Sequence, residues 1–353
     1  MTPLSGTRED WLAAFVSELY GPIPDPLPVA VTPHPLPDAN AERLTLTIEG
    51  FTVDACLWRP AAQLRGVIIA LDFLGPAGVL LSDAYPFDPN AIVALPPWRG
   101  DGSGPLDASL RGAGRHRWPV ETMLAAGWAV MTSCYGSWVP DSPERWRDSG
   151  LVPLLGEGTR AISLWAWALQ RMADAASQLG LGAIVLAGHS RLGKAALWAA
   201  ANDTRVAAVL SNDSGCGGAS LSRHAPIGSE TLAVMRARFP HWLLPEKPLS
   251  VDQHQLLAAI APRALHVASA NDDAWADPQG EYLALAAAAS AWGLELPPLA
   301  EVYRPGGELS RGALGWHLRP GGHELLPYDW ARFLSFLDTL PLHRPAGSVH
   351  RHS

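Results

Sequence analysis

Residues 183–194 constrain the fold more than any other part of the chain. They read Ala-Ile-Val-Leu-Ala-Gly-His-Ser-Arg-Leu-Gly-Lys, an apolar strand that passes through Gly188 and Ser190 directly into an alanine-rich helix. A strand, a tight turn and a helix in this order hold a serine on an exposed elbow, with helix N–H groups behind it. A serine that caps the helix N-terminus is the alternative interpretation. The glycines at positions 188 and 193 favour the elbow, and we expect a nucleophile at Ser190.

Apolar runs that alternate with helical patterns predict the rest of the architecture. The expected strands cover residues 43–58, 66–71, 128–135, 183–187, 206–211, 264–269 and 301–303. Such a series predicts an α/β fold with a mostly parallel central sheet, helices on both faces, and a ligand site beyond the carboxyl ends of the strands. We expect a single domain over residues 1–353 with an N-terminal helix and a proline-rich extension over about residues 1–40, in which residues 22–37 form an extended linker. Residues 75–114 read as a long loop that borders the cleft.

Composition excludes several classes of protein. Hydrophobic residues make up 48% of the 353 residues and charged residues only 17%, which excludes a disordered chain or a coiled coil. A net charge of −8 and the lack of a basic run argue against nucleic acid as a partner. Every long apolar stretch is broken by glycine, proline or charge before it reaches the length of a membrane span. We therefore expect no membrane partner.

The three cysteines and the N-terminus give weaker indications. Cys56, Cys134 and Cys216 are widely spaced and form no CxxC pair, so we expect structural thiols and neither a disulfide framework nor a zinc site. Residues 1–20 carry acidic residues among apolar ones at helical spacing, and they lack the basic start and apolar centre of a secretory signal. As written, the sequence predicts a cytoplasmic protein, or a secreted or periplasmic one if a leader has been removed.

A nucleophilic serine needs a base, and the base needs an orienting acid. His323 lies in the loop Arg319-Pro-Gly-Gly-His-Glu324, after the last expected strand and before the closing helix, and His317 is its rival. Asp273 follows the strand at 264–269, whereas Asp213 ends the preceding strand, and either acid would lie near the carboxyl edge of the sheet. The order serine, acid, histidine is the one in which esterases of the α/β class arrange these groups.

Several segments together resemble one known family. These are Gly188-His-Ser-Arg-Leu-Gly-Lys194, Ser211-Asn-Asp-Ser-Gly-Cys-Gly-Gly218, Asp252-Gln-His254, Ile260-Ala-Pro-Arg263, Trp275, Arg117-Trp-Pro119 and Tyr135-Gly136. They resemble the glucuronoyl esterases, carbohydrate esterase family fifteen, over roughly residue 10 to the end. The resemblance implies an α/β-hydrolase fold and serine chemistry without metal or cofactor. It also implies a small-molecule or oligosaccharide substrate in which a lignin alcohol is esterified to 4-O-methyl-glucuronic acid.

The resemblance also implies roles for individual residues. Ser190 resembles the nucleophile and His323 the base. The family often has a glutamate where this chain has Asp213, and some members have an aspartate two residues before a tryptophan, which is Asp273 before Trp275 here. We favour Asp273 as the acid with Asp213 as its helper. Trp275 resembles the tryptophan that packs on the uronate ring.

Two cations beside the nucleophile complete the expected site. Arg191 resembles the family's arginine that supports the oxyanion, and its permanent charge and several donors suit that role. Lys194 resembles the lysine that contacts sugar hydroxyls. It lies one helical turn beyond Ser190, on the same face, in a chain with 24 arginines and only 2 lysines. A lysine that extends to solvent is the alternative.

Two other functions remain open at this point. A broader carboxylesterase or acetylxylan esterase would use the same nucleophile on a small acyl group. A non-catalytic carbohydrate-binding protein would keep the fold and a tryptophan-lined cleft, but the full set of serine, histidine and aspartate argues against it.

Overall fold

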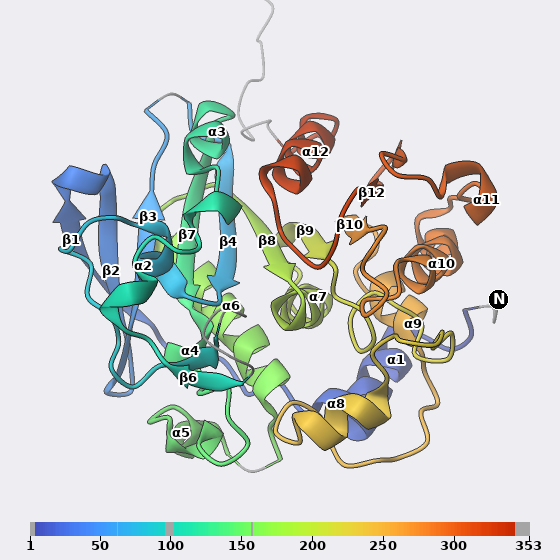
Figure 1. Ribbon diagram of the computed structural model, residues 1–353, viewed down its shortest axis with the longest axis horizontal. Helices are drawn as coiled ribbons and strands as arrows, with labels where there is room; N and C mark the ends of the chain where they lie inside the picture. The colour runs from blue at the N-terminus through green and yellow to red at the C-terminus, as the bar shows by residue number, and fades with distance from the viewer. Residues whose placement is uncertain (1–3, 62, 96–101, 157, 343–353) are drawn as a thin grey trace, which may run out of the picture.

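The computed structural model describes residues 4–61, 63–95, 102–156 and 158–342, and most of its strands join in one sheet (Figure 1). The strands are β1 Ala30–Leu36, β2 Ala41–Ile48, β3 Phe51–Trp58, β4 Gly66–Asp72, β5 Ile92–Ala94, β6 Ser103–Pro105, β7 Trp128–Cys134, β8 Ala183–His189, β9 Val206–Asn212, β10 Ala264–Ala270, β11 Glu308–Arg311 and β12 Leu314–Arg319. The ten-stranded sheet has the order β1-β2-β3-β7-β4-β8-β9-β10-β12-β11, while β5 and β6 form a separate ribbon. The strands from β7 to β12 in this order pair in parallel, and antiparallel strands flank them on both sides.

Helices cover both faces of this sheet, as the alternating pattern predicts. They are α1 Arg8–Phe15, α2 Gly75–Val79, α3 Val120–Ala125, α4 Tyr135–Trp138, α5 Val152–Leu155, α6 Ala161–Gln178, α7 Arg191–Asn202, α8 Leu232–Arg238, α9 Gln253–Ala258, α10 Pro278–Ala288, α11 Leu299–Val302 and α12 Pro327–Asp338. One hydrophobic cluster contains α6, α7 and α10, and a second contains α3 and α12. Strands β4, β7 and β10 are buried along their whole length because they lie between these two layers. The predicted α/β fold is confirmed, and it is that of an α/β hydrolase.

The N-terminal helix is held by segments much later in the chain. Arg8 of α1 donates Nε–H to the carbonyl oxygen of Ala259 at 2.9 Å and an Nη2 hydrogen to that of Ala201, at the end of α7. Phe15 of α1 lies against Trp198 of α7 at a ring-centroid distance of 6.2 Å, and Tyr20, just after the helix, stacks on the same ring at 4.9 Å. The helix is therefore packed against the layer that supports the nucleophile.

Three local expectations need correction. Residues 301–303 are not a strand: α11 covers Leu299–Val302, and the last strands are β11 and β12. The proline-rich stretch is not wholly a linker, because β1 pairs antiparallel with β2 at the edge of the sheet, where the missing N–H groups of prolines are tolerated. The loop at 75–114 contains α2 and the β5–β6 ribbon, and its residues 96–101 lie outside the described residues.

Within the described part of the chain, no helix combines the length and hydrophobicity that crossing a bilayer requires.

Candidate active site

Ser190 stands on a strained elbow between β8 and α7. Its backbone has φ 56° and ψ −128°, in the region that side-chain-bearing residues rarely adopt. A Cβ on Gly188 would lie 2.1 Å from the carbonyl oxygen of Leu192, so this glycine is required for strand and helix to meet so closely. The Ser190 side chain makes no capping hydrogen bond to α7. Ser190 therefore occupies the N-cap position of α7, but its side chain does not cap the helix.

The Ser190 hydroxyl instead begins a chain of hydrogen bonds. Its Oγ lies 2.9 Å from Nε2 of His323, and Nδ1 of the same ring lies 2.6 Å from Oδ2 of Asp273. His323 is on the loop after β12, and Asp273 is on the loop after β10, where the carboxyl ends of parallel strands meet. Asp273 is 97% buried, whereas the His323 side chain remains 35% exposed. The geometry gives a serine backed by a base and a buried acid.

Asp213 lies beside this chain but makes different contacts. Its Oδ1 accepts the backbone N–H of Ala270 at 2.8 Å, and its Oδ2 lies 3.4 Å from Nη2 of Arg319. Burial, with the nearby Glu281 and Asp273 carboxylates, raises the pKa of Asp213 above its ordinary value. Of the two candidate acids, the structure therefore sets Asp273 on the histidine and Asp213 behind it.

His317, the rival base, is directed away from the serine. It is fully buried in β12, its Nε2 lies 2.9 Å from Asp329, and its Nδ1 lies 2.8 Å from Nε2 of His266. Both ring nitrogens of His317 thus have partners other than Ser190.

Arg191 follows the nucleophile and is fixed by a network that the sequence did not reveal. Its Nη1 donates to Asp141, and its guanidinium lies 4.4 Å from the ring centroid of Trp242. Asp141 also accepts from the Tyr135 hydroxyl at 2.7 Å and from His241 Nε2 at 2.9 Å. Burial opposes ionisation of Asp141, but the Arg191 charge and these hydrogen bonds lower its pKa below the ordinary value. Arg191 Nε is buried and has no hydrogen-bond partner among the described residues.

Lys194, for which we expect a contact with sugar hydroxyls, is buried and bonded to protein groups. Its side chain is 2% exposed, and its Nζ donates to the carbonyl oxygens of Ser214 and Cys216 and to Glu230 Oε2 at 2.7 Å. An ammonium group has three donors, and here all three have protein acceptors. Position on a helix predicts the direction of a side chain but not its partners, so the contact with sugar hydroxyls stays a prediction. Lys194 ties Glu230 to the loop that follows β9.

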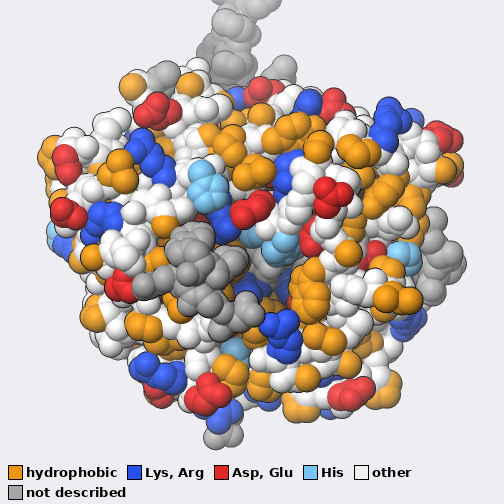
Figure 2. Space-filling model, in the orientation of Figure 1, with side chains coloured by type: hydrophobic (Ala, Val, Ile, Leu, Met, Phe, Trp, Pro, Cys, Tyr) orange, Lys and Arg blue, Asp and Glu red, His pale blue; other side chains and the backbone are white. Residues whose placement is uncertain are grey.

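Trp275 lies next to the Lys194–Glu230 pair. Its ring is partly exposed, the Arg238 guanidinium lies 5.8 Å from the ring centroid, and its carbonyl oxygen accepts the Glu230 N–H at 2.8 Å. The buried Glu230 was not anticipated, because no local pattern sets it apart from other acidic residues. In the space-filling view, histidine, arginine and acidic side chains gather around a hollow over the region of β8 and α7 (Figure 2).

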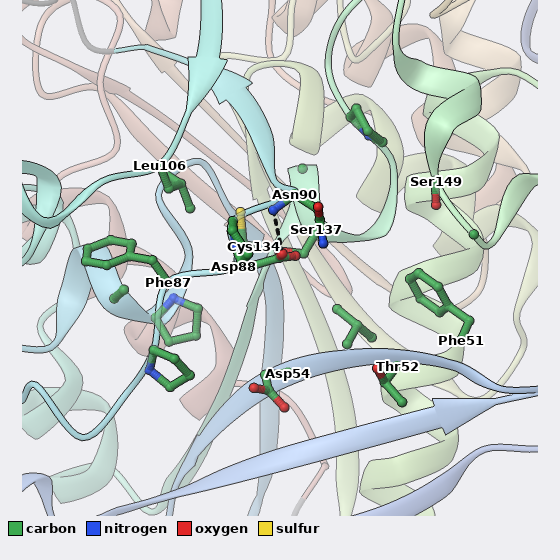
Figure 3. Close-up of a pocket in the computed structure, with 18 of the residues that line it drawn as sticks. Phe51, Thr52, Asp54, Phe87, Asp88, Asn90, Leu106, Cys134, Ser137 and Ser149 are labelled. Atoms are coloured by element: carbon green, nitrogen blue, oxygen red, sulfur yellow. Dashed lines mark hydrogen bonds between the residues drawn. The ribbon is translucent and has the colours of Figure 1, made fainter.

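A pocket of about 700 Å³ lies past the ends of β4 and β7 (Figure 3). Phe51, Asp54, Phe87 and Cys134 are among its lining residues, and none of the described residues that line it belongs to the serine, histidine and aspartate group. This pocket is therefore separate from the candidate active site.

One group of side chains among the described residues has the spacing for a metal ion: Asp213, Asp273 and His323, whose ligand atoms lie within 4.8 Å of one another. Both ring nitrogens of His323 already have partners, Asp273 and Ser190. A metal at this place would have to displace one of them, so the donor set fits a catalytic triad better than a metal centre.

Comparison with known proteins gives consistent matches. A family model described as glucuronyl esterase, fungi, matches residues 124–294. A curated carbohydrate esterase from an unknown prokaryotic organism is 35% identical over 254 residues, which are 65% of this chain and 57% of that protein. The 4-O-methyl-glucuronoyl methylesterase 1 of Phanerochaete chrysosporium is 28% identical over 191 residues, 48% of this chain and 38% of that protein. The chain thus spans 57% of the length of the first of these curated relatives and 38% of the second.

Solved structures match over nearly the whole chain. A glucuronoyl esterase from Solibacter usitatus is 32% identical, with a TM-score of 0.78 over 94% of this chain and 91% of that one. A structure from a marine bacterial metagenome, described as a promiscuous esterase of carbohydrate esterase family fifteen, is 28% identical, with a TM-score of 0.82 over 96% and 91%.

Proposed function

The chain belongs to the glucuronoyl esterases of carbohydrate esterase family fifteen, and from this membership we propose that it hydrolyses esters of glucuronic acid through an acyl-enzyme on Ser190. The observation that carries the proposal is the hydrogen-bonded series from Ser190 through His323 to Asp273, with distances of 2.9 and 2.6 Å. These three groups are a nucleophile, a base and an orienting acid at hydrogen-bonding distance.

The reaction proceeds in two steps. As Ser190 Oγ attacks the ester carbonyl, its proton passes to His323 Nε2, and Asp273 holds the other ring nitrogen protonated. His323 then gives the proton to the oxygen of the departing alcohol. The uronoyl group stays bound to Ser190 as the acyl-enzyme. In the second step a water molecule gives a proton to His323 and attacks the acyl carbon. The bond to Ser190 Oγ then breaks, His323 returns the proton to Oγ, and the uronic acid leaves.

Negative charge develops on the carbonyl oxygen in both steps, and α7 offers groups to stabilise it. The backbone N–H of Arg191 opens the helix behind the serine, at the positive end of the helix dipole. The guanidinium contributes a fixed positive charge, because Asp141 and Trp242 hold it in one place. A donor that is fixed before the reaction needs no reorganisation in the transition state.

The acyl side of the substrate lies against the loops after β9 and β10 in this proposal. Trp275 presents an aromatic face, which suits the apolar face of a sugar ring. Glu230 provides a carboxylate acceptor next to it, and Lys194 holds that carboxylate in place.

The test is hydrolysis of benzyl glucuronate by the unaltered protein and by Ser190→Ala. Loss of the nucleophile should lower kcat by about 10⁴-fold or more. A fluorophosphonate probe should label Ser190 in the folded protein and fail to label the variant. Full hydrolysis by Ser190→Ala would refute the mechanism.

An aryl acetate belongs in the same panel, because one structural relative is described as a promiscuous esterase. A strong preference for the acetate would replace the uronate proposal with a broader carboxylesterase. Absence of labelling at Ser190 in folded protein would indicate a carbohydrate-binding protein without catalysis.

A further inference from the structure

His323, the base of the proposed triad, lies on a loop whose sequence is rich in glycine and therefore flexible. Residues 320–324 read Pro-Gly-Gly-His-Glu, and Gly321 has φ 101°, which side-chain-bearing residues rarely adopt. Glycines increase the backbone freedom that a loop loses when it is fixed. His323 nevertheless lies at hydrogen-bonding distance from both Ser190 and Asp273. Contacts from outside the loop must therefore hold it.

Arg319, the last residue of β12, makes these contacts. It is 97% buried, and its Nη1 donates to the carbonyl oxygen of Pro320 at 2.9 Å. Its Nη2 donates to the carbonyl oxygens of Gly322 at 2.9 Å and Glu324 at 2.7 Å. Residues 322 and 324 are the two neighbours of His323, so one guanidinium fixes the backbone on both sides of the base.

Buried carboxylates hold the guanidinium itself. Arg319 Nε lies 3.1 Å from Asp329 Oδ2 and 3.2 Å from Oδ1, and Nη2 lies 3.4 Å from Asp213 Oδ2. Asp329 belongs to α12 and also accepts from His317 Nε2 at 2.9 Å. A buried arginine is stable only when its charge is matched, and here α12 and the loop after β9 supply the matching charges.

We propose that Arg319 is a positioning residue for the base: it holds the loop that keeps His323 between Ser190 and Asp273. The inference rests on the proposed function of the triad. Arginine suits this task because its planar fork carries donors on three nitrogens that face different directions. A lysine keeps the charge but concentrates its donors on one atom, which cannot reach Asp329 and three carbonyl oxygens together.

Arg319→Lys is the test variant, with benzyl glucuronate as substrate. A small displacement of a catalytic group costs about 10²-fold, so kcat should fall by about that factor while KM stays within about threefold. The rate of fluorophosphonate labelling at Ser190 should fall in parallel. Unchanged kcat and labelling in folded Arg319→Lys would overturn the proposal.

Arg263→Lys is the matched control. Arg263 Nη1 also donates to three carbonyl oxygens, those of Ala200, Asp203 and Val206, at 2.7, 2.9 and 3.3 Å, but it lies outside the triad loop. It should lose stability to urea without loss of kcat per folded molecule. If both variants lose activity only in proportion to their unfolded fraction, Arg319 has a structural role alone and the proposal fails.

Amide hydrogen exchange on the unaltered protein keeps the proposal falsifiable if Arg319→Lys does not fold. Gly321 N–H donates to Asn271 Oδ1 at 3.1 Å, and the fixed loop should protect it from exchange. Exchange as fast as in a free peptide would overturn the proposal. Labelling of Ser190 does not depend on a uronate substrate, so a failure of the proposed substrate class is distinguishable from a failure of this inference.

Discussion

The choice between two buried aspartates is open to a direct kinetic test. In Asp273→Asn, the amide keeps the shape of the acid but not its charge. An amide nitrogen that faces His323 Nδ1 would favour the tautomer with the proton on Nε2, which cannot accept the serine proton. Asp273 lies 2.6 Å from Nδ1 and is 97% buried, so water cannot replace it without rearrangement.

The expected loss is large for this variant and small for its neighbour. Replacing the orienting acid of a serine triad by its amide costs about 10⁴-fold in kcat, or about 5.5 kcal/mol. Asp213→Asn should cost less than about tenfold, because Asn tolerates the φ of 44° at this position and its amide oxygen still accepts the Ala270 N–H.

The assay is kcat for benzyl glucuronate at neutral pH, together with the rate of fluorophosphonate labelling. Unfolding in urea at the same pH serves as the control for stability. A larger loss of kcat in Asp213→Asn than in Asp273→Asn would refute the assignment. Two small losses in the single variants and a large one in the double variant would mean that the acids share the role.

Burial raises the pKa of Glu281 from 4.5 to about 8. Between these two pH values the native protein holds a proton on Glu281 that the unfolded chain releases. The free energy of unfolding therefore falls as pH rises through this range. Glu281→Gln should reduce this slope by about 1.4 kcal/mol per pH unit in urea unfolding from pH 5 to 8, and an unchanged slope would contradict the burial argument. Lys194→Met should cost about 3–5 kcal/mol because it leaves Glu230 buried without a counter-charge, and adding Glu230→Gln should recover part of the loss. Unaltered stability with a raised KM would instead make Lys194 a substrate contact. Trp275→Ala should raise KM for uronate esters by about tenfold and leave aryl acetates unaffected, whereas equal changes would remove its role in sugar binding.

The sequence predicts the central sheet well because its strands are continuous apolar runs. The strand at Leu314–Arg319 escaped prediction for the opposite reason, since it contains His317 and Arg319 and reads as polar. Both side chains are buried only because Asp329 of α12 pairs with them. No local sequence pattern shows that an acidic residue on another element will pair with a buried polar side chain.

The same distinction separates the site residues. Ser190 was predictable because a strand, two glycines and a helix within twelve residues define its elbow. Asp141 and Arg319 were not, since each acts through partners that only the fold brings together. The partners of Lys194 were not predictable for the same reason, because the donors of a lysine bond to whichever acceptors the tertiary structure provides.

The anchoring of α1 has a consequence for synthesis of the chain. Arg8 bonds to Ala259, which is 251 residues later in the sequence. At typical rates of translation, about 5–20 residues per second, α1 waits on the order of 10–50 s for this partner to leave the ribosome. During that time its apolar side, with Trp11 and Phe15, lacks the surface that buries it in the finished molecule. The contact from Arg8 to Ala259 can therefore form only after α7 and the serine elbow have been synthesised.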